Sequence, residues 1–298
     1  MHPDPHAGSR ALTAFLTAKL AAGKSPATLQ FYAHACASFL DACPDWPPTP
    51  GSIQAWLLSL RPQHAEATAA SYYRGARAFL NWCIRTGRLN DSPLAGLDPP
   101  REPEPEPRAV PVDALRALFG AMAARAARGD LLATRDHALF RLIYDCGLRV
   151  SEACNLRRRD LDLERQSATI RRGKGGRYRE TFFGSRTREA LGRWLVVFPG
   201  MEVVWPSLNW QSGIRALTRR GVHLALQKWC ARAGVEPFRV HDLRHSYVTH
   251  ALRRGIDAGQ VSQQAGHSDV AFTLRVYGKT ASEERRVSHL RLAPGDEV

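Results

Sequence analysis

An alternation of proline and glutamate over residues 97–107 constrains this chain more than any other feature. The segment reads Leu-Asp-Pro-Pro-Arg-Glu-Pro-Glu-Pro-Glu-Pro. Proline lacks the amide donor that helices and central strands require, and it biases the preceding residue away from helical backbone. We therefore expect a stiff, extended linker over 97–111, with one domain at 9–96 and a second at 112–298.

The length and composition exclude several classes of protein. A chain of 298 residues, 44% hydrophobic and 23% charged, can bury two cores and is neither disordered nor collagen-like. No apolar run reaches the roughly 18 residues of a membrane span, and the first residues show no leader pattern. The six cysteines form no CxxC pair, so we expect reduced thiols in a cytoplasmic protein that has no membrane partner.

The net charge is +14, and +13 of it falls in 112–298, where nearly every basic residue is arginine. A GC-rich coding sequence accounts for the excess of arginine over lysine, but it does not account for a strongly basic domain. Such a domain indicates a polyanionic partner, most often nucleic acid.

Hydrophobic periodicity predicts a mainly helical chain with one small β-sheet or hairpin. We expect helices over 9–22, 27–42, 51–60 and 65–86 in the first domain, and over 112–127 and 133–145 at the start of the second. Two strands, at 167–172 and 177–183, flank a Gly-rich turn and predict a β-hairpin. From residue 186 the pattern is helical again, with breaks at 199–206, 234–237, 255, 266 and 278.

Arg149 and Glu152 are the first candidates for a functional site. Arg149 follows Gly147, which we expect to end the preceding helix, and Glu152 can share its helical face and orient the guanidinium. Taken alone, the two residues are more simply interpreted as a local ion pair, with Ser151 capping the next helix.

His241 and Arg244 are spaced to lie on one face at the start of a helix, where the helix dipole favours an anion. A surface helix rich in histidine and arginine is an equally good interpretation of these residues alone. His241 and His245 also imitate a His-x-x-x-His zinc motif, but no third ligand stands at a natural spacing.

Lys174 and Tyr277 carry little information by themselves. Lys174 lies in the Gly-rich turn among arginines, where it can lower into a groove and donate a proton or only touch phosphates; the spacing of a Walker loop is absent. Tyr277 follows His267 by ten residues and precedes a glycine, and a lone tyrosine there is more typical of a core.

The order of these residues along the chain resembles the tyrosine recombinase (phage integrase) family, in particular its Xer-like members. The resemblance covers about 112–280 in detail, and it implies a helical core-binding domain followed by a mixed α/β catalytic domain. Ala265 departs from the pattern, because a larger apolar residue is usual there. The six positions that the family uses for catalysis are occupied here by Arg149, Lys174, His241, Arg244, His267 and Tyr277.

The resemblance implies a site-specific recombinase that cuts and rejoins DNA through a 3′-phosphotyrosine. Tyr277 is then the nucleophile, and Arg149 and Arg244 clamp the phosphate. Lys174 protonates the 5′ leaving oxygen, while His241 and His267 assist as proton carrier and hydrogen-bond donor. Glu152 orients Arg149. We expect no ATP, no metal and no other cofactor.

The resemblance also implies double-stranded DNA as the partner and a homo- or heterotetramer on that DNA. The segment 282–292 is expected to dock on a neighbouring subunit, and the protein to be associated with the nucleoid when DNA is bound. Candidate phosphate contacts, which can equally form a solvated basic face, are Arg157, Arg158, Arg159, Arg171 and Arg172.

Two other functions remain open from the sequence. A type IB topoisomerase shares this chemistry but relaxes supercoils without exchanging partners. A DNA-binding regulator on the same fold has no need for Tyr277, so the complete set of six residues disfavours it.

Overall fold

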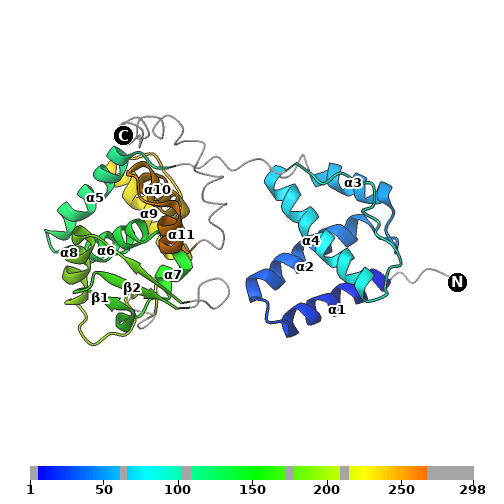
Figure 1. Ribbon diagram of the computed structural model, residues 1–298, viewed down its shortest axis with the longest axis horizontal. Coiled ribbons are helices and arrows are strands. Elements are labelled where there is room, and N and C mark those ends of the chain that lie inside the picture. Colours follow the sequence, from blue (N-terminus) through cyan, green and yellow to red (C-terminus); the bar gives the residue numbers. More distant parts are fainter. Residues whose placement is uncertain (1–5, 61–65, 102–108, 172–177, 209–214, 267–298) are drawn as a thin grey trace, which may run out of the picture. The chain divides into compact units, whose positions relative to one another are not determined.

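The computed structural model describes residues 6–60, 66–101, 109–171, 178–208 and 215–266. The chain divides into two compact units, Met1–Pro105 and Glu106–Val298, and the division falls within the predicted linker. Each unit has its own hydrophobic core. Helices dominate both units, and one small antiparallel sheet lies in the second, as the sequence predicts (Figure 1).

The described part of the first unit contains four helices, each within two residues of an expected one. They are α1 (Ala7–Ala21), α2 (Pro26–Ala42), α3 (Pro50–Leu60) and α4 (Glu66–Arg85). The start of α2 shows why: the Ser25 hydroxyl accepts a hydrogen bond from the Thr28 amide at 3.2 Å. Pro26 stands at the first helical position, where its missing N–H is not needed.

Aromatic rings fill the core of the first unit. The ring of Phe15 on α1 packs edge-on against Phe79 and Trp82 of α4, at centroid distances of 5.5 and 5.6 Å. Helices α2 and α4 approach closely at Gly75, where an added Cβ would lie 2.7 Å from the Cβ of Ala35. The missing side chain at Gly75 therefore sets the spacing of these two helices.

The second unit is built around α6, which contacts α5, α7, α8 and α10. Its Leu139, Phe140 and Ile143 are fully buried. Among the described residues, no helix has both the length and the apolar character needed to cross a membrane. The helices of this unit are α5 (Val112–Ala126), α6 (Leu131–Asp145), α7 (Val150–Cys154), α8 (Ser185–Leu195), α9 (Arg219–Ala233), α10 (Val240–Arg253) and α11 (Ala258–Ala265).

The sheet confirms the expected hairpin and adds one strand. Strands β2 (Ser167–Ile170) and β3 (Arg179–Phe182) pair antiparallel. Strand β1 (Leu161–Asp162) follows the short 3₁₀ helix Arg158–Asp160 and pairs with the other edge of β2. Two residues are too few to show a period, so the sequence did not predict β1. The strand order β1-β2-β3 leaves β3 at an edge of the sheet.

The sequence predicts that the helical pattern resumes directly after residue 206. This prediction is wrong, because the described residues 207, 208 and 215–218 are not helical. The Ser207 amide donates to the Arg215 carbonyl at 2.7 Å, and the Leu217 amide donates to the Trp205 carbonyl at 2.8 Å. Pro206 and Ala216 form an isolated antiparallel bridge beside Trp205, whose side chain is fully buried. The helical pattern resumes only at α9.

The contact at Gly75 predicts a specific stability defect. Alanine is ordinarily better than glycine inside a helix by about 1 kcal/mol, but overpacking a core costs about 1–3 kcal/mol. We expect Gly75→Ala to lower the free energy of unfolding by about 1 kcal/mol, measured by urea unfolding of the full-length chain.

Gly51→Ala is the matched control, because an added Cβ there meets only the Thr49 hydroxyl at 3.9 Å; it should be neutral or slightly stabilising. Adding Ala35→Gly to Gly75→Ala should restore stability. Equal stability of the two single variants would contradict the close contact.

Candidate functional site

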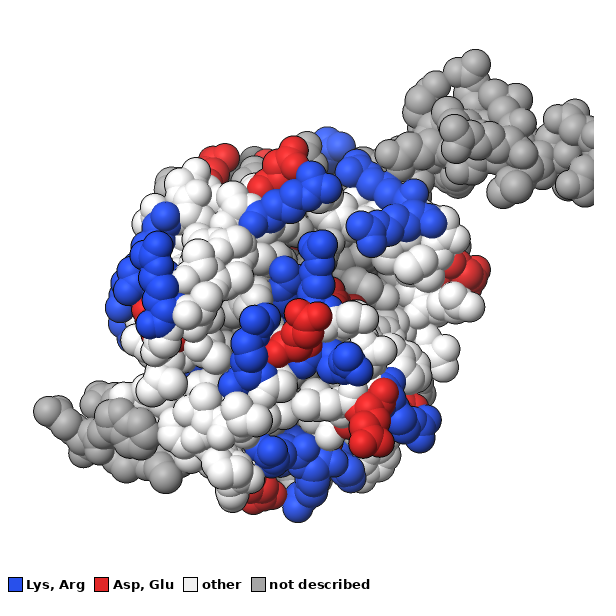
Figure 2. All heavy atoms as spheres, turned by 90° about the vertical axis from the view of Figure 1, so that its left-hand side faces the viewer, with Lys and Arg blue, Asp and Glu red and all other residues white. Residues whose placement is uncertain are grey.

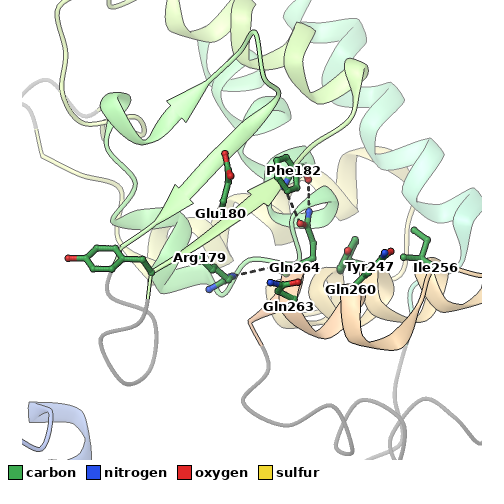
Figure 3. A pocket seen from close by; sticks show the side chains of 9 residues that line it. Arg179, Glu180, Phe182, Tyr247, Ile256, Gln260, Gln263 and Gln264 are labelled. Atoms are coloured by element: carbon green, nitrogen blue, oxygen red, sulfur yellow. Dashed lines mark hydrogen bonds between the residues drawn. The ribbon is translucent and has the colours of Figure 1, made fainter.

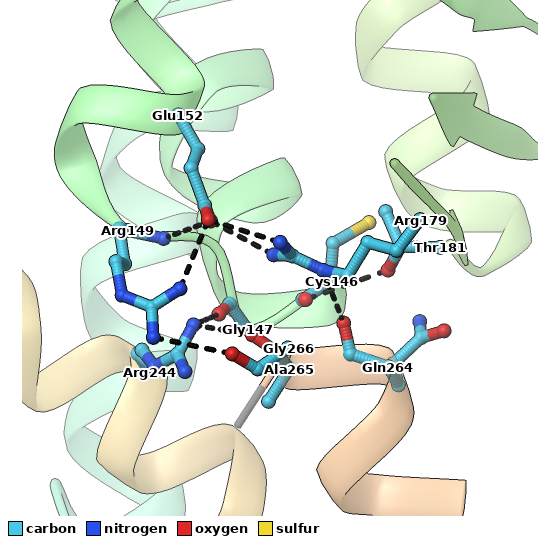
Figure 4. A network of polar contacts seen from close by, with 10 residues as sticks. All are labelled: Cys146, Gly147, Arg149, Glu152, Arg179, Thr181, Arg244, Gln264, Ala265 and Gly266. Carbon is cyan, nitrogen blue, oxygen red and sulfur yellow. Dashed lines mark hydrogen bonds and ion pairs between the residues drawn. The ribbon is translucent and has the colours of Figure 1, made fainter. Parts of the chain in front are cut away.

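The candidate site lies where the turn after α6 meets α7, β3, α10 and the end of α11 (Figure 4). Gly147 makes this turn with a left-handed backbone, φ +58°, as its expected position at the end of a helix implies. An added Cβ at Gly147 would lie 2.7 Å from the Tyr247 ring and 3.4 Å from the Cβ of Ala265. Glycine thus lets α10 and α11 approach the turn.

Glu152 on α7 is the centre of a buried network. Its side chain is 4% exposed, and its two carboxylate oxygens accept hydrogen bonds from Arg179 at 2.9 and 2.8 Å. The same oxygens accept from the backbone amide and the guanidinium of Arg149, at 2.9 and 3.0 Å. Burial alone would raise the pKa of Glu152, but the hydrogen bonds and charges of Arg179 and Arg149 lower it to about 2.

Arg149 is therefore paired with Glu152, but the pair is not merely local. Arg149 is the N-cap residue of α7, which begins at Val150, so the expectation that Ser151 caps this helix is wrong. The cap is the Glu152 carboxylate, which binds the Arg149 amide from within the first turn. The Arg149 guanidinium also donates to the Gly266 carbonyl at 3.1 Å, and its side chain is 31% exposed.

Arg244 on α10 reaches the same place from the other side. Its Nη1 donates to the carbonyls of Gly147 and Ala265, both at 2.6 Å, and the residue is 2% exposed. Arg149 and Arg244 thus bind the adjacent carbonyls of Gly266 and Ala265 at the end of α11 (Figure 4). The structure brings together two arginines that are far apart in the sequence.

His241 is exposed at the start of α10, one turn before His245. Their rings meet edge to face, with centroids 4.4 Å apart. Loss of solvation and the charge of Arg244 lower the pKa of His241. Burial and the charge of His241 lower the pKa of His245 to about 4. Both rings are consequently neutral at pH 7.

The zinc interpretation of these two histidines gains no support from the geometry. In the part of the chain that the structure describes, no three His, Cys, Asp or Glu side chains are grouped so as to hold a metal ion.

Arg179 is the site residue that the sequence did not single out. The sequence places it only among the arginines flanking the hairpin turn, yet its side chain is 12% exposed and pairs with Glu152. Strand alternation was the available signal: Arg179 and Thr181 share one face of β3, and Thr181 is fully buried.

Several predicted residues lie outside the described part of the chain. They are Lys174, His267, Tyr277 and Arg172, together with the segment 282–292. Their proximity to Arg149 and Arg244 therefore stays a prediction.

The remaining phosphate candidates make contacts within the protein. Arg158 donates to the Leu195 carbonyl at 2.8 Å, and Arg171 pairs with the buried Asp160. Arg159, 68% exposed, pairs with Glu202 at 3.2 Å, while Arg157 binds Asp160 through its backbone amide. Arginine and lysine outnumber acidic side chains on the face drawn in Figure 2, in keeping with the basic character of this unit.

Comparison with known proteins identifies the family. The sequence pattern of the phage integrase family matches residues 111–284. The chain belongs to the phage integrase family. It is 33% identical over 212 residues to the tyrosine recombinase XerC of Azotobacter vinelandii, a match that covers 70% of this chain and 69% of that protein.

Solved integrase structures share the fold. The Tn1549 transposon integrase, solved in complex with a circular intermediate DNA, aligns with a TM-score of 0.76 at 14% identity over 96% of this chain and 99% of that one. A lambda integrase dimer bound to a core site aligns with a TM-score of 0.71 at 15% identity over 89% and 96%. The network around Glu152 therefore lies in a unit with the integrase fold.

The low pKa of Glu152 predicts a pH-dependent contribution to stability. Because the folded-state pKa is about 2 and the unfolded value is about 4.3, the contribution is complete above pH 5 and is lost as the pH falls toward 2. We expect Glu152→Gln to lower the free energy of unfolding by about 3 kcal/mol at pH 7. The difference from the unsubstituted chain should shrink as urea unfolding is repeated at pH 5, 4 and 3.

Glu180→Gln is the control, since Glu180 is an exposed neighbour on β3. It should change stability little at any of these pH values. A Glu152→Gln defect of the same size at pH 3 and pH 7 would contradict the ionised, paired carboxylate.

Proposed function

We propose that this protein is a site-specific DNA recombinase that cuts and rejoins strands by transesterification through a 3′-phosphotyrosine. The observation that supports this most is that the guanidinium groups of Arg149 and Arg244 donate to two adjacent carbonyls at the end of α11. Two guanidinium groups at one place suit a phosphodiester whose non-bridging oxygens gain charge in the transition state. The sequence continues from Gly266 directly to His267 and, ten residues on, to Tyr277.

In the proposed reaction, the Tyr277 oxygen forms a bond to phosphorus while the bond to the 5′ oxygen breaks. Neutral His241 accepts the phenolic proton, which its lowered pKa permits. Lys174 gives a proton to the 5′ oxygen, and His267 donates a hydrogen bond to the phosphate. The reverse reaction rejoins the strand.

The proposal includes no requirement for ATP or metal. The phosphotyrosine ester keeps the energy of the broken phosphodiester bond, so rejoining needs no nucleotide. The positive charge that stabilises the transition state comes from Arg149 and Arg244, which carry it at all physiological pH values.

Both units are proposed to bind double-stranded DNA, the first (9–96) as a core-binding domain and the second (112–298) as the catalytic domain. The lambda integrase neighbour was solved as a dimer on a core site, and we propose a homo- or heterotetramer on DNA, held through 282–292. The place of action is then the DNA of the cytoplasm.

The first test is covalent trapping on a nicked suicide substrate that carries the protein's own recombination site. We expect the unsubstituted chain to form a protein–DNA adduct, and Tyr277→Phe to form none while it binds the site with similar affinity. The phenyl ring keeps the size of the side chain but removes the nucleophilic oxygen. Gel electrophoresis under denaturing conditions measures the adduct.

Two further assays separate the alternatives. Supercoil relaxation without exchange between two sites would indicate a type IB topoisomerase. An unsubstituted chain that binds DNA but never forms an adduct would indicate a regulator and refute the proposed reaction.

The phosphate contacts predict a salt effect. If Arg159 contacts a phosphate, Arg159→Gln should reduce the slope of log affinity against log salt by about one unit. Arg116→Gln is the matched control, because Arg116 is 75% exposed and also paired, with Asp113 at 2.7 Å, but is not among the candidates. Fluorescence anisotropy across a salt series measures both, and identical slopes would remove Arg159 from the interface.

A further inference from the structure

Strand β3 and helix α11 are joined by an unusual set of contacts. The Gln264 side-chain oxygen accepts from the Phe182 amide at 3.1 Å, and its amide nitrogen donates to the Phe182 carbonyl at 2.6 Å. The side chain thus takes the place that a neighbouring strand would occupy at this sheet edge (Figure 3). At the other end of β3, Arg179 Nε donates to the Gln264 carbonyl at 3.1 Å.

Arg179 binds two elements at once. Its Nη1 and Nη2 donate to the two carboxylate oxygens of Glu152, and its Nε donates to the Gln264 carbonyl in the last turn of α11. The guanidinium also lies against Gly266, where an added Cβ would approach it to 2.7 Å. Only arginine offers donors in a planar fork with a third N–H directed elsewhere.

Arg179 and Arg149 both donate hydrogen bonds to the carboxylate of Glu152. Arg149 has one guanidinium bond to this carboxylate and one to the Gly266 carbonyl. Without Arg179, Arg149 would be the one remaining cation beside Glu152 in this network. The carboxylate would then attract both terminal nitrogens of the Arg149 guanidinium. Arg149 would then turn away from the end of α11.

We propose that Arg179 is a positioning residue for the recombination reaction: through Glu152 it sets the orientation of Arg149, and through Gln264 it fixes the end of α11 on the edge of β3. This inference rests on the proposed function of Arg149. Arg179 does not contact DNA in this scheme, because each of its three side-chain nitrogens already donates to a protein acceptor.

Arg179→Lys is the central variant, since it keeps the charge beside Glu152 but loses the fork. We expect the single-turnover rate constant for adduct formation to fall about 100-fold, the usual consequence of a misplacement of about 1 Å in a catalytic group. Affinity for site DNA should change less than about threefold, because phosphate contacts that determine binding are elsewhere. A purely structural role would instead lower the active fraction and leave the rate constant unchanged.

Arg165→Lys is the matched control. Arg165 pairs with Glu180 of β3 at 3.8 Å and is 70% exposed, so the substitution should leave rate, affinity and stability unaltered.

A double-mutant cycle tests the route through Glu152. Arg179→Met, Glu152→Gln and the double variant are compared for the same rate constant; the double variant leaves no buried charge unpaired and guards against misfolding of Arg179→Met. If Arg179 acts through Glu152, adding Arg179→Met to Glu152→Gln should slow cleavage less than threefold. Multiplicative effects, or cleavage by Arg179→Lys at the rate of the unsubstituted chain, would overturn the inference.

The unsubstituted chain separates this failure from failure of the proposed function. If it forms no adduct under the same conditions, the recombinase reaction itself is wrong. If the unsubstituted chain forms the adduct and the Arg179 variants form it with the same rate constant, the positioning role alone is wrong.

Discussion

The buried carboxylate of Glu152 is the interaction on which the rest of the second unit's site depends. A carboxylate offers about four lone-pair directions, and here four hydrogen bonds occupy them, two from Arg179 and two from Arg149. An ion buried without such partners would destabilise the fold by several kcal/mol. Folding therefore brings both arginines to this point before any DNA is bound.

Small side chains make this arrangement sterically possible. Gly147 and Ala265 face each other where the turn after α6 meets α11, and both of their carbonyls accept from the same Nη1 of Arg244. Ala265 departs from the larger apolar residue usual in the family, yet it is fully buried. The ring of Tyr247 lies close to Gly147 and packs against the apolar cluster that contains Ala265. The departure is thus absorbed by packing, and the anchoring of Arg244 is retained.

Local signals predicted most of the fold, and tertiary contacts decided what they missed. Hydrophobic periodicity located the helices, and the spacing of Arg149 and Glu152 indicated their ion pair. The link from Glu152 to Arg179 crosses 27 residues, and no period specifies which arginine of a basic hairpin turns inward. Strand β1 and the paired backbone around Trp205 likewise depend on packing rather than on local propensity.

The two phosphate-binding candidates are anchored differently, and the difference fits a preorganised site. Arg244 is buried and bound to backbone carbonyls, which cannot move without the turn and α11 moving too. Arg149 is partly exposed and is held by a carboxylate whose other partner is Arg179. Loss of solvation lowers the pKa of His241, and the positive field of Arg244 and Arg149 lowers it further. A phosphodiester bound between the arginines offsets that field and favours protonated histidine, so in the proposed reaction His241 becomes a better proton acceptor only after the DNA phosphate is in place.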